Sequence, residues 1–375
     1  MDIWRTFRQQ FPVTEKVTYL NHAAVSPLPL RCKDRMQEYL EEVTRFGAHN
    51  HLERVPATLS LARSLGARLL GTAPDRVFFV RSTTQGIGLA ATGLQFAQGD
   101  NVVLARQEFP ANLRPWMPLR RRGVELRLVE PREGRVLLDD VAAAVDDRTV
   151  AVSLSFIQFL SGFRVDLGAV AKICRRHDAL LVVDGIQGVG AFPLDVEAAG
   201  VDLLSADSHK WLLGPEGVGL GYASPRALDR IQPAVEGWLS VERPFDFFDL
   251  DQPLKSTAAR FEEGAHNLVG INGLIGCLEL LLEIGPDAMS ARILELTDFL
   301  VDELHARGWA VRSPRDQAGE KSGIVLAEKK DVDTDLLGAL LHREGIVVSI
   351  RGGALRVSPH GYNNQADLER LLEYL

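Results

Sequence analysis

The feature that most limits the fold of this chain is a repeated alternation of short apolar runs with amphipathic stretches. The runs are rich in Val and Leu and show no strict alternation, which is typical of strands buried on both faces of a sheet. They occupy residues 76–80, 101–105, 124–129, 149–157, 179–184, 201–207 and 217–223. Strand–helix alternation of this kind predicts an α/β fold with a mostly parallel central sheet, which binds ligands at the carboxyl ends of its strands.

The pattern changes after about residue 265. One long helical pattern is followed by shorter apolar runs and by a final helix with leucines on one face, which favours a smaller α+β domain. The long helix is expected at 267–285, the strands at 322–327, 345–350 and 354–358, and the final helix at 364–375. We therefore predict a large domain at 15–265, a connecting helix at 266–285 and a small domain at 286–375, on which residues 1–14 pack.

Composition excludes several classes of protein. The 375 residues carry a net charge of −8, and nucleic-acid surfaces need clustered Lys and Arg, so no nucleic-acid partner is expected. We find no signal-peptide core and no stretch apolar enough for a bilayer, so no membrane partner is expected either. Cys32, Cys174 and Cys277 are far apart and lack metal-binding spacing, which predicts reduced thiols in the cytoplasm and no metal site.

Two charged residues follow apolar runs where a sheet does not need them. Asp184 ends "LLVVD", and Lys210 comes shortly after "VDLLSAD". In the ordinary interpretation Asp184 caps a helix and Lys210 is a surface lysine. The alternative joins them, because a buried charge needs a partner. An aldehyde cofactor bound to Lys210 as a Schiff base, with its ring nitrogen held by Asp184, is what pyridoxal phosphate requires.

Such a cofactor also needs a phosphate site. The stretch "FVRSTTQGIGLAATG" places Ser82, Thr83 and Thr84 between a strand and a helix, and N–H groups and hydroxyls at a helix N-terminus bind phosphate well. Ser and Thr are also ordinary helix caps, so this motif alone is weak. Together with Lys210 and Asp184 it favours a pyridoxal-phosphate site.

A set of motifs in order along the chain resembles the class V branch of the fold-type I pyridoxal-phosphate enzymes. That branch includes cysteine desulfurases, kynureninase, isopenicillin N epimerase and several aminotransferases. The motifs are "YLNHAAVSPLP", "RSTTQGIGLAATG", "EFPANLRPW", "SFIQFLSGFRVDL", "VVDGIQGVGAFPLDV", "SADSHKWLLGPEGVG", "RFEEGAHN" and "LRVSPHGYNN". The resemblance implies the fold-type I architecture, pyridoxal 5'-phosphate as cofactor, an amino-acid substrate and a homodimer with sites at its interface.

The resemblance also implies roles for single residues near the cofactor. Lys210 carries the cofactor and moves protons, Asp184 pairs with the ring nitrogen, and Gln187 donates to the ring hydroxyl. The remaining cofactor-binding residues are Thr83 and Thr84 at the phosphate, His209 beside them with a catalytic role, Phe109 stacked on the ring, and Asn267. Asn267 is expected to compensate for Ala265, which replaces a threonine that many relatives lend to the partner's phosphate.

For the substrate, the resemblance implies that Arg356 grips the carboxylate as a bidentate fork, with Asn112 and His22 nearby. Desulfurases carry a cysteine on the loop before this arginine, whereas "SIRGGALRVS" offers none. This absence disfavours a persulfide-forming desulfurase, and no residue separates amino transfer from elimination. We expect a class V aminotransferase. The alternative is a lyase that cleaves a C–S or other β-carbon bond without a catalytic cysteine, and an epimerase is a weaker candidate. Lys210 and Asp184 argue against a non-catalytic binding protein.

Overall fold

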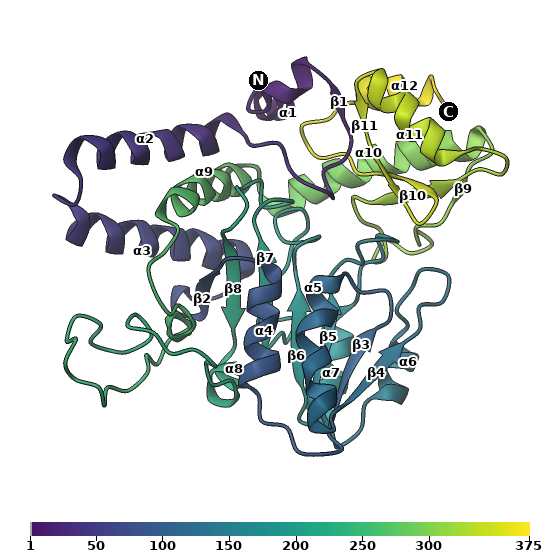
Figure 1. The fold of residues 1–375 in the computed structure, drawn as a ribbon. Coiled ribbons are helices and arrows are strands. Elements are labelled where there is room, and N and C mark those ends of the chain that lie inside the picture. The colour runs from purple at the N-terminus through teal and green to yellow at the C-terminus, as the bar shows by residue number, and fades with distance from the viewer. Residues whose placement is uncertain (1) are drawn as a thin grey trace.

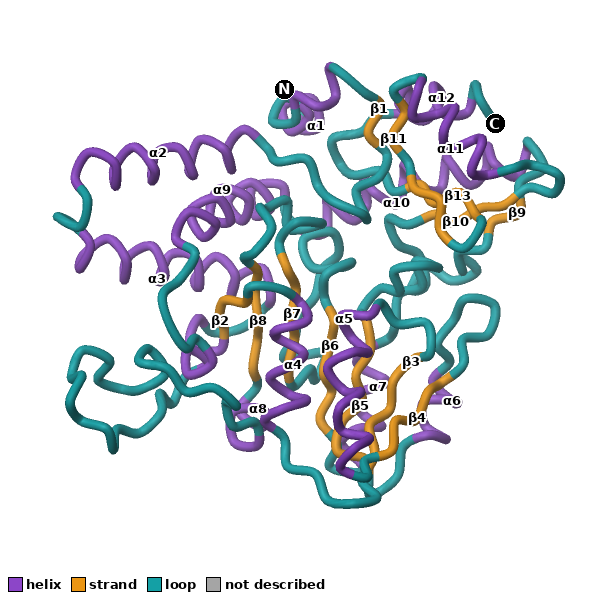
Figure 2. The backbone as a smooth tube through the Cα atoms, in the orientation of Figure 1, coloured by secondary structure: helices purple, strands orange, loops and turns teal. Residues whose placement is uncertain are grey.

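The computed structural model describes residues 2–375 and contains a large α/β domain and a smaller domain at the C-terminal end (Figure 1). The central sheet of the large domain has the strand order β2-β8-β7-β6-β5-β3-β4, and only β8 runs antiparallel to its neighbours. Its strands are β2 (Val77–Val80), β3 (Asn101–Ala105), β4 (Glu125–Val129), β5 (Thr149–Ser155), β6 (Leu180–Asp184), β7 (Leu203–Asp207) and β8 (Gly219–Ala223). The predicted mostly parallel α/β sheet is thus confirmed (Figure 2).

Apolar and polar residues do not strictly alternate in these strands, because both faces of the sheet are buried. In β6, Leu180 and Val182 belong to one core cluster, while Leu181 and Val183 belong to the other. Helices α4 and α8 pack on the first face, and α3, α7 and α9 pack on the second. The helices before the small domain are α2 (Leu30–Phe46), α3 (His51–Leu70), α4 (Thr83–Gly93), α5 (Pro110–Leu113), α6 (Leu138–Ala144), α7 (Leu167–Arg176), α8 (Pro225–Arg230) and α9 (Leu268–Ile284). Short 3₁₀ turns lie at Pro12–Glu15, Pro74–Arg76, Arg114–Arg122 and Ala258–Phe261.

Helix α9 packs against α2 through glycines, which explains why two of the cysteines are inaccessible. A Cβ on Gly276 would lie 2.7 Å from the backbone oxygen of Arg31, so only glycine allows this approach. The close packing leaves Cys32 and Cys277 with no exposed surface, and the Cys277 thiol donates to the Leu213 carbonyl oxygen at 3.2 Å.

The small domain is built on the antiparallel sheet β12-β13-β10-β9. Its elements are α10 (Pro286–Ala306), β9 (Ala310–Val311), β10 (Val325–Glu328), α11 (Thr334–Arg343), β11 (Ile346–Val347), β12 (Ser349–Arg351), β13 (Ala354–Val357) and α12 (Gln365–Leu372). Leu368, Leu371 and Leu372 of α12 are buried in its core.

The N-terminal segment also lies with the small domain. In α1 (Ile3–Arg8), the Arg8 guanidinium pairs with Asp367 at 2.6 Å, and strand β1 (Thr18–Tyr19) pairs in parallel with β11. These contacts connect the first and last elements of the chain, and α1 and α12 both lie at the top of Figure 1.

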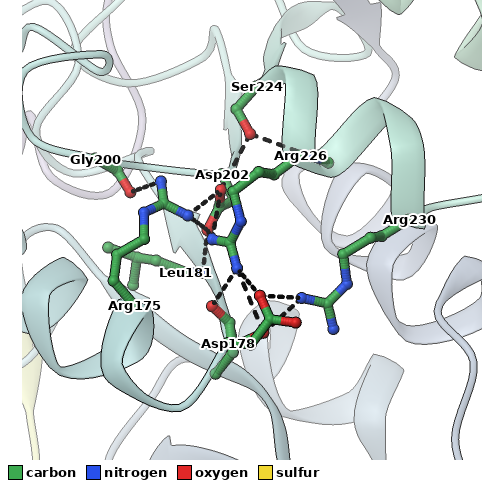
Figure 3. Close-up of polar contacts among 10 residues, drawn as sticks. Arg175, Asp178, Leu181, Gly200, Asp202, Ser224, Arg226 and Arg230 are labelled. Atoms are coloured by element: carbon green, nitrogen blue, oxygen red, sulfur yellow. Dashed lines mark hydrogen bonds and ion pairs between the residues drawn. The ribbon is translucent and has the colours of Figure 1, made fainter.

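The edge of the central sheet where β6 and β7 begin holds a saturated ion network (Figure 3). Asp202 has no exposed surface, and its Oδ2 accepts from the Leu181 N–H at 2.9 Å. The guanidinium groups of Arg175 and Arg226 lie 3.0 and 3.1 Å from its carboxylate oxygens, and the Ser224 hydroxyl donates at 3.1 Å. Every oxygen of this buried carboxylate therefore has a donor.

Among the described helices, none is by itself long and apolar enough to cross a membrane. Helices α9 and α10 satisfy the same length and composition test only as a pair bent by 79°.

Candidate active site

A cavity of about 420 Å³ lies where β6 and β7 end, between the large domain and the β12–β13 hairpin of the small domain. It contains most of the residues that the sequence analysis selected. Those that line it are Thr83, Thr84, Phe109, Gln187, His209, Lys210 and Arg356. Ligand sites of parallel α/β sheets are expected at this edge.

Lys210 is the basic group at the centre of the candidate chemistry. It is 7% exposed, and burial lowers the pKa of its ammonium to about 8, with Asp184 opposing the shift and Arg356 adding to it. Its Nζ lies 5.4 Å from the centre of the Phe109 ring. A lysine with a depressed pKa supplies a neutral amine near neutral pH, which a nucleophile or general base requires.

Asp184, the last residue of β6, is a buried carboxylate with one unused oxygen. Its Oδ1 accepts from the Ile186 N–H at 3.0 Å, whereas Oδ2 has no hydrogen-bond partner within residues 2–375. Burial raises the pKa of this carboxyl to about 7, the Ile186 N–H and Lys210 lower it, and Glu108 raises it further. A buried oxygen without a donor is costly, so the site is suited to a ligand that brings an N–H, as a protonated pyridine does.

Glu108 is a buried acid that the sequence analysis passed over. Its carboxylate accepts from the Ser155 N–H at 2.8 Å, from the Gln158 amide at 2.9 Å and from the Ser155 hydroxyl. Burial raises the pKa of Glu108, although these donors oppose the shift. Glu108 in turn contributes to the raised pKa of Asp184.

The N-terminus of α4 forms the expected anion-binding end of the cavity. Ser82 caps the helix by accepting from the Gln85 N–H at 3.2 Å, and the opening N–H groups of a helix lack partners within it. The Thr83 hydroxyl accepts from the Asp207 N–H at 3.1 Å. His209 lines the same cavity, and its Nδ1 lies 3.2 Å from Asp207 Oδ2.

Arg356 on β13 presents an unpaired guanidinium edge. The side chain is 2% exposed, and its Nη1 donates to the Phe159 carbonyl oxygen at 2.9 Å. Nε and Nη2 have no partner in the described part of the chain. Burial, with a contribution from Arg351, lowers the pKa of this group to about 10. Nε and Nη2 form the edge that binds a carboxylate through two parallel hydrogen bonds.

Gln187 and Phe109 line the cavity in different ways. The Gln187 amide is already engaged, because Nε2 donates to the Ala23 carbonyl at 3.0 Å and Oε1 accepts from the Trp211 indole at 2.7 Å. Phe109 is 42% exposed and meets Phe159 edge to face, with ring centres 5.3 Å apart. An exposed ring at the wall is suited to stacking on a planar ligand.

Four predicted site residues are not among those that line this cavity: Asp184, described above, and Asn112, His22 and Asn267. Asn112 is buried and accepts from the Ser153 hydroxyl at 2.5 Å. His22 is also buried, with Nε2 3.2 Å from the Lys210 carbonyl oxygen and Nδ1 3.1 Å from the Tyr362 hydroxyl. Burial lowers the pKa of His22 to about 3. Asn267 caps α9 and lines a separate cavity of about 430 Å³. Their roles toward substrate or cofactor stay predictions.

The residues present fit pyridoxal phosphate. Lys210 can hold its aldehyde, the free oxygen of Asp184 its ring nitrogen, and the α4 N-terminus with His209 its phosphate. The fold and this cavity therefore define a fold-type I pyridoxal-phosphate enzyme.

Comparisons with known proteins give the family. The sequence profile described as "Aminotransferase class-V" matches residues 18–371. A "Probable cysteine desulfurase" of Methanothermobacter thermautotrophicus is 29% identical over 98% of this chain and 96% of its own length. "Uncharacterized aminotransferase C777.03c" of Schizosaccharomyces pombe is 30% identical over 98% of this chain and 94% of its own. The apo cysteine desulfurase of Thermococcus onnurineus superposes with a TM-score of 0.90 at 24% identity, covering 100% of this chain and 97% of that one.

The chain belongs to the class V aminotransferase family. It has the fold-type I architecture, and its cofactor is pyridoxal 5'-phosphate, as the resemblance implied.

Proposed function

We propose that this protein is a pyridoxal-phosphate-dependent lyase that cleaves a bond at the β-carbon of an α-amino acid, with a C–S bond as the first candidate. The amino-acid substrate is supported by one observation: buried Arg356 lines the cavity that contains Lys210, and its Nε and Nη2 have no partner among the described residues. The name of the Methanothermobacter relative supports cleavage rather than the amino transfer that the sequence analysis favoured.

The chemistry divides among few residues. The cofactor, when bound, withdraws electrons from the α-carbon. Arg356 holds the substrate carboxylate, and the Lys210 Nζ, whose pKa is depressed to about 8, takes the α-proton as a neutral base. Asp184 keeps a proton on the ring nitrogen. Overall, a β-thio-substituted amino acid and water give a 2-oxo acid, ammonia and a thiol.

The positions of the cysteines support direct release of the sulfur product. Cys32, Cys174 and Cys277 are buried, and burial raises the pKa of Cys174 to about 12 and that of Cys277 well above its usual range. A buried, protonated thiol is a poor nucleophile. The sulfur of the substrate therefore leaves as free sulfide or thiol and not as an enzyme-bound persulfide.

Amino transfer remains the second candidate, supported by the name of the Schizosaccharomyces relative, because both reactions begin with loss of the α-proton. The loaded enzyme is incubated with L-cysteine, L-cystine and a panel of other amino acids, with and without a 2-oxo acid acceptor. A lyase releases ammonia and 2-oxo acid in equal amounts without acceptor. Turnover that requires the acceptor and releases no ammonia would assign amino transfer instead.

We further propose that the protein acts as a homodimer. Large apolar side chains gather on one loop, where Phe248 is 95% and Leu250 90% exposed. Surfaces of this kind on a monomer mark interaction sites. Asn267 and its neighbours would then approach the partner's phosphate site. A monomeric mass in light scattering at micromolar concentration, with activity intact, would refute this proposal.

A further inference from the structure

The β12–β13 hairpin places two arginines on one face. Ser349 pairs with Arg356 and Arg351 pairs with Ala354, and directly opposite residues of an antiparallel pair point to the same side. Arg351 and Arg356 therefore share a face, while Ile350 and Leu355 on the other face pack in the small-domain core. Gly352 and Gly353 close the hairpin with φ values of 57° and 75°, which a two-residue turn of this type requires. The tight turn fixes Arg351 at the wall of the cavity.

Arg351 is exposed at the tip of the hairpin, and within residues 2–375 its guanidinium makes neither a hydrogen bond nor an ion pair. It borders both the Lys210 cavity and a neighbouring groove of about 570 Å³. The other arginines of that groove are neutralised, since Arg135 pairs with Glu320 at 3.0 Å, Arg312 with Glu328 and Arg315 with Asp298.

The charge of Arg351 reaches the candidate active site. It lowers the pKa of both Lys210 and Arg356, so a second fixed cation acts on the place where the substrate carboxylate is expected. One carboxylate needs only the Arg356 edge. A second unpaired guanidinium on the same hairpin face is suited to a second anionic group on the same ligand.

We propose that Arg351 selects α-amino acids whose side chain carries an acidic group, such as a carboxylate or a sulfur oxoacid. This group is bonded to the β-carbon directly or lies one or two bonds beyond it. This inference rests on the proposed function, because it assumes that Arg356 binds the α-carboxylate of an amino acid. Arg351 binds the side-chain anion in the substrate complex and thereby determines specificity.

The test compares a charged ligand with its neutral isostere. L-Aspartate and L-asparagine are titrated into the cofactor-loaded enzyme, and the change in cofactor absorbance gives each Kd without any need for turnover. In the wild type we expect aspartate to bind about tenfold more tightly than asparagine, as one charge-assisted contact allows. Arg351→Gln should remove this preference while leaving the Kd of asparagine within about twofold, because its carboxylate still binds Arg356.

Two further variants separate specificity from general electrostatics. Arg351→Lys keeps the charge and should retain part of the preference for aspartate. Arg312→Gln removes a paired arginine of the neighbouring groove and should retain all of it. Equal preference in wild type and Arg351→Gln, or no preference in the wild type, would overturn the inference.

The outcome is distinguishable from failure of the proposed lyase. A protein that prefers aspartate through Arg351 but releases no ammonia from any amino acid keeps this inference and loses the lyase. An enzyme that releases sulfide from cysteine but shows no preference for aspartate keeps the proposed lyase and loses the inference about Arg351.

Discussion

Two buried aspartates at opposite edges of the same sheet have opposite surroundings. Asp202, just before β7, is saturated by two arginines, a serine hydroxyl and a backbone N–H (Figure 3). Asp184, at the end of β6, receives one backbone N–H, and its other oxygen has no donor among the described residues. Both are at most 1% exposed. Burial therefore does not distinguish them, but hydrogen-bond saturation does.

The same contrast holds for arginines. Arg175 and Arg226 each contact the Asp202 carboxylate, whereas the buried Arg356 donates only to the Phe159 carbonyl. A folded chain rarely leaves buried polar groups unpaired, so the incompletely paired Asp184 and Arg356, which both act on Lys210, indicate a ligand site. The ion network around Asp202 thus stabilises the fold, whereas the unpaired groups of Asp184 and Arg356 are expected to bind cofactor and substrate.

The largest effect is expected from Lys210→Ala. Among the residues that line the cavity, Lys210 is the only lysine, so its removal should abolish covalent attachment of the cofactor and all turnover. Visible absorption of the reconstituted variant measures cofactor attachment, and an activity assay measures turnover. A variant that retains the absorption band and the activity of the wild type would remove the site from this edge of the sheet.

Arg356→Gln should weaken amino-acid binding by roughly 2–5 kcal/mol, because the substrate carboxylate loses a buried charged partner. The cofactor should stay bound, and KM or Kd for amino acids is the measurement. Arg226→Gln at the opposite edge is the matched control, since it should lower stability and leave KM unchanged. Equal KM values for the Arg356 variant and the wild type would refute its role.

The two aspartates can be compared directly by urea unfolding of the cofactor-free protein. Asp202→Asn should lower the free energy of unfolding by about 3 kcal/mol, because it leaves Arg175 and Arg226 without their carboxylate. Asp184→Asn should leave the free energy of unfolding unchanged or raise it, because it removes a charge that lacks a partner. Equal destabilisation by both substitutions would show that Asp184 is as structural as Asp202.

The pKa of Asp184 adds a pH signature to this comparison. Its folded value of about 7 exceeds the ordinary value of an aspartate, so between these two values the folded state binds more protons than the unfolded state. This carboxyl therefore stabilises less as pH rises from about 4 to 7. The gap in unfolding free energy between Asp184→Asn and the wild type should widen over that range. A constant gap would contradict the raised pKa.

The sequence predicted the sheet and most of the cavity because both follow from residue order along strands. Apolar runs identify buried strands, and the residues after them, such as Asp184 and Lys210, must meet at one edge. Side-chain direction does not follow from order. Asn112 turns to Ser153 and His22 to Tyr362, although both belong to motifs beside the site. Glu108 was not predicted, although an acidic residue three positions after the buried strand β3 was a usable signal.

The smallest effect on turnover is expected from replacing all three cysteines, because none of them lines the cavity. They are buried in packed helices, and the hairpin between Arg351 and Arg356 carries glycines in place of a reactive thiol. Cys32→Ala and Cys174→Ala keep the packing small, and Cys277→Ser keeps a donor for the Leu213 carbonyl. We expect the triple variant to bind cofactor and to turn over within a few-fold of the wild type. A folded, cofactor-loaded variant without activity would instead show a catalytic thiol, and with it a persulfide-forming reaction in which one cysteine opens toward the cavity during turnover.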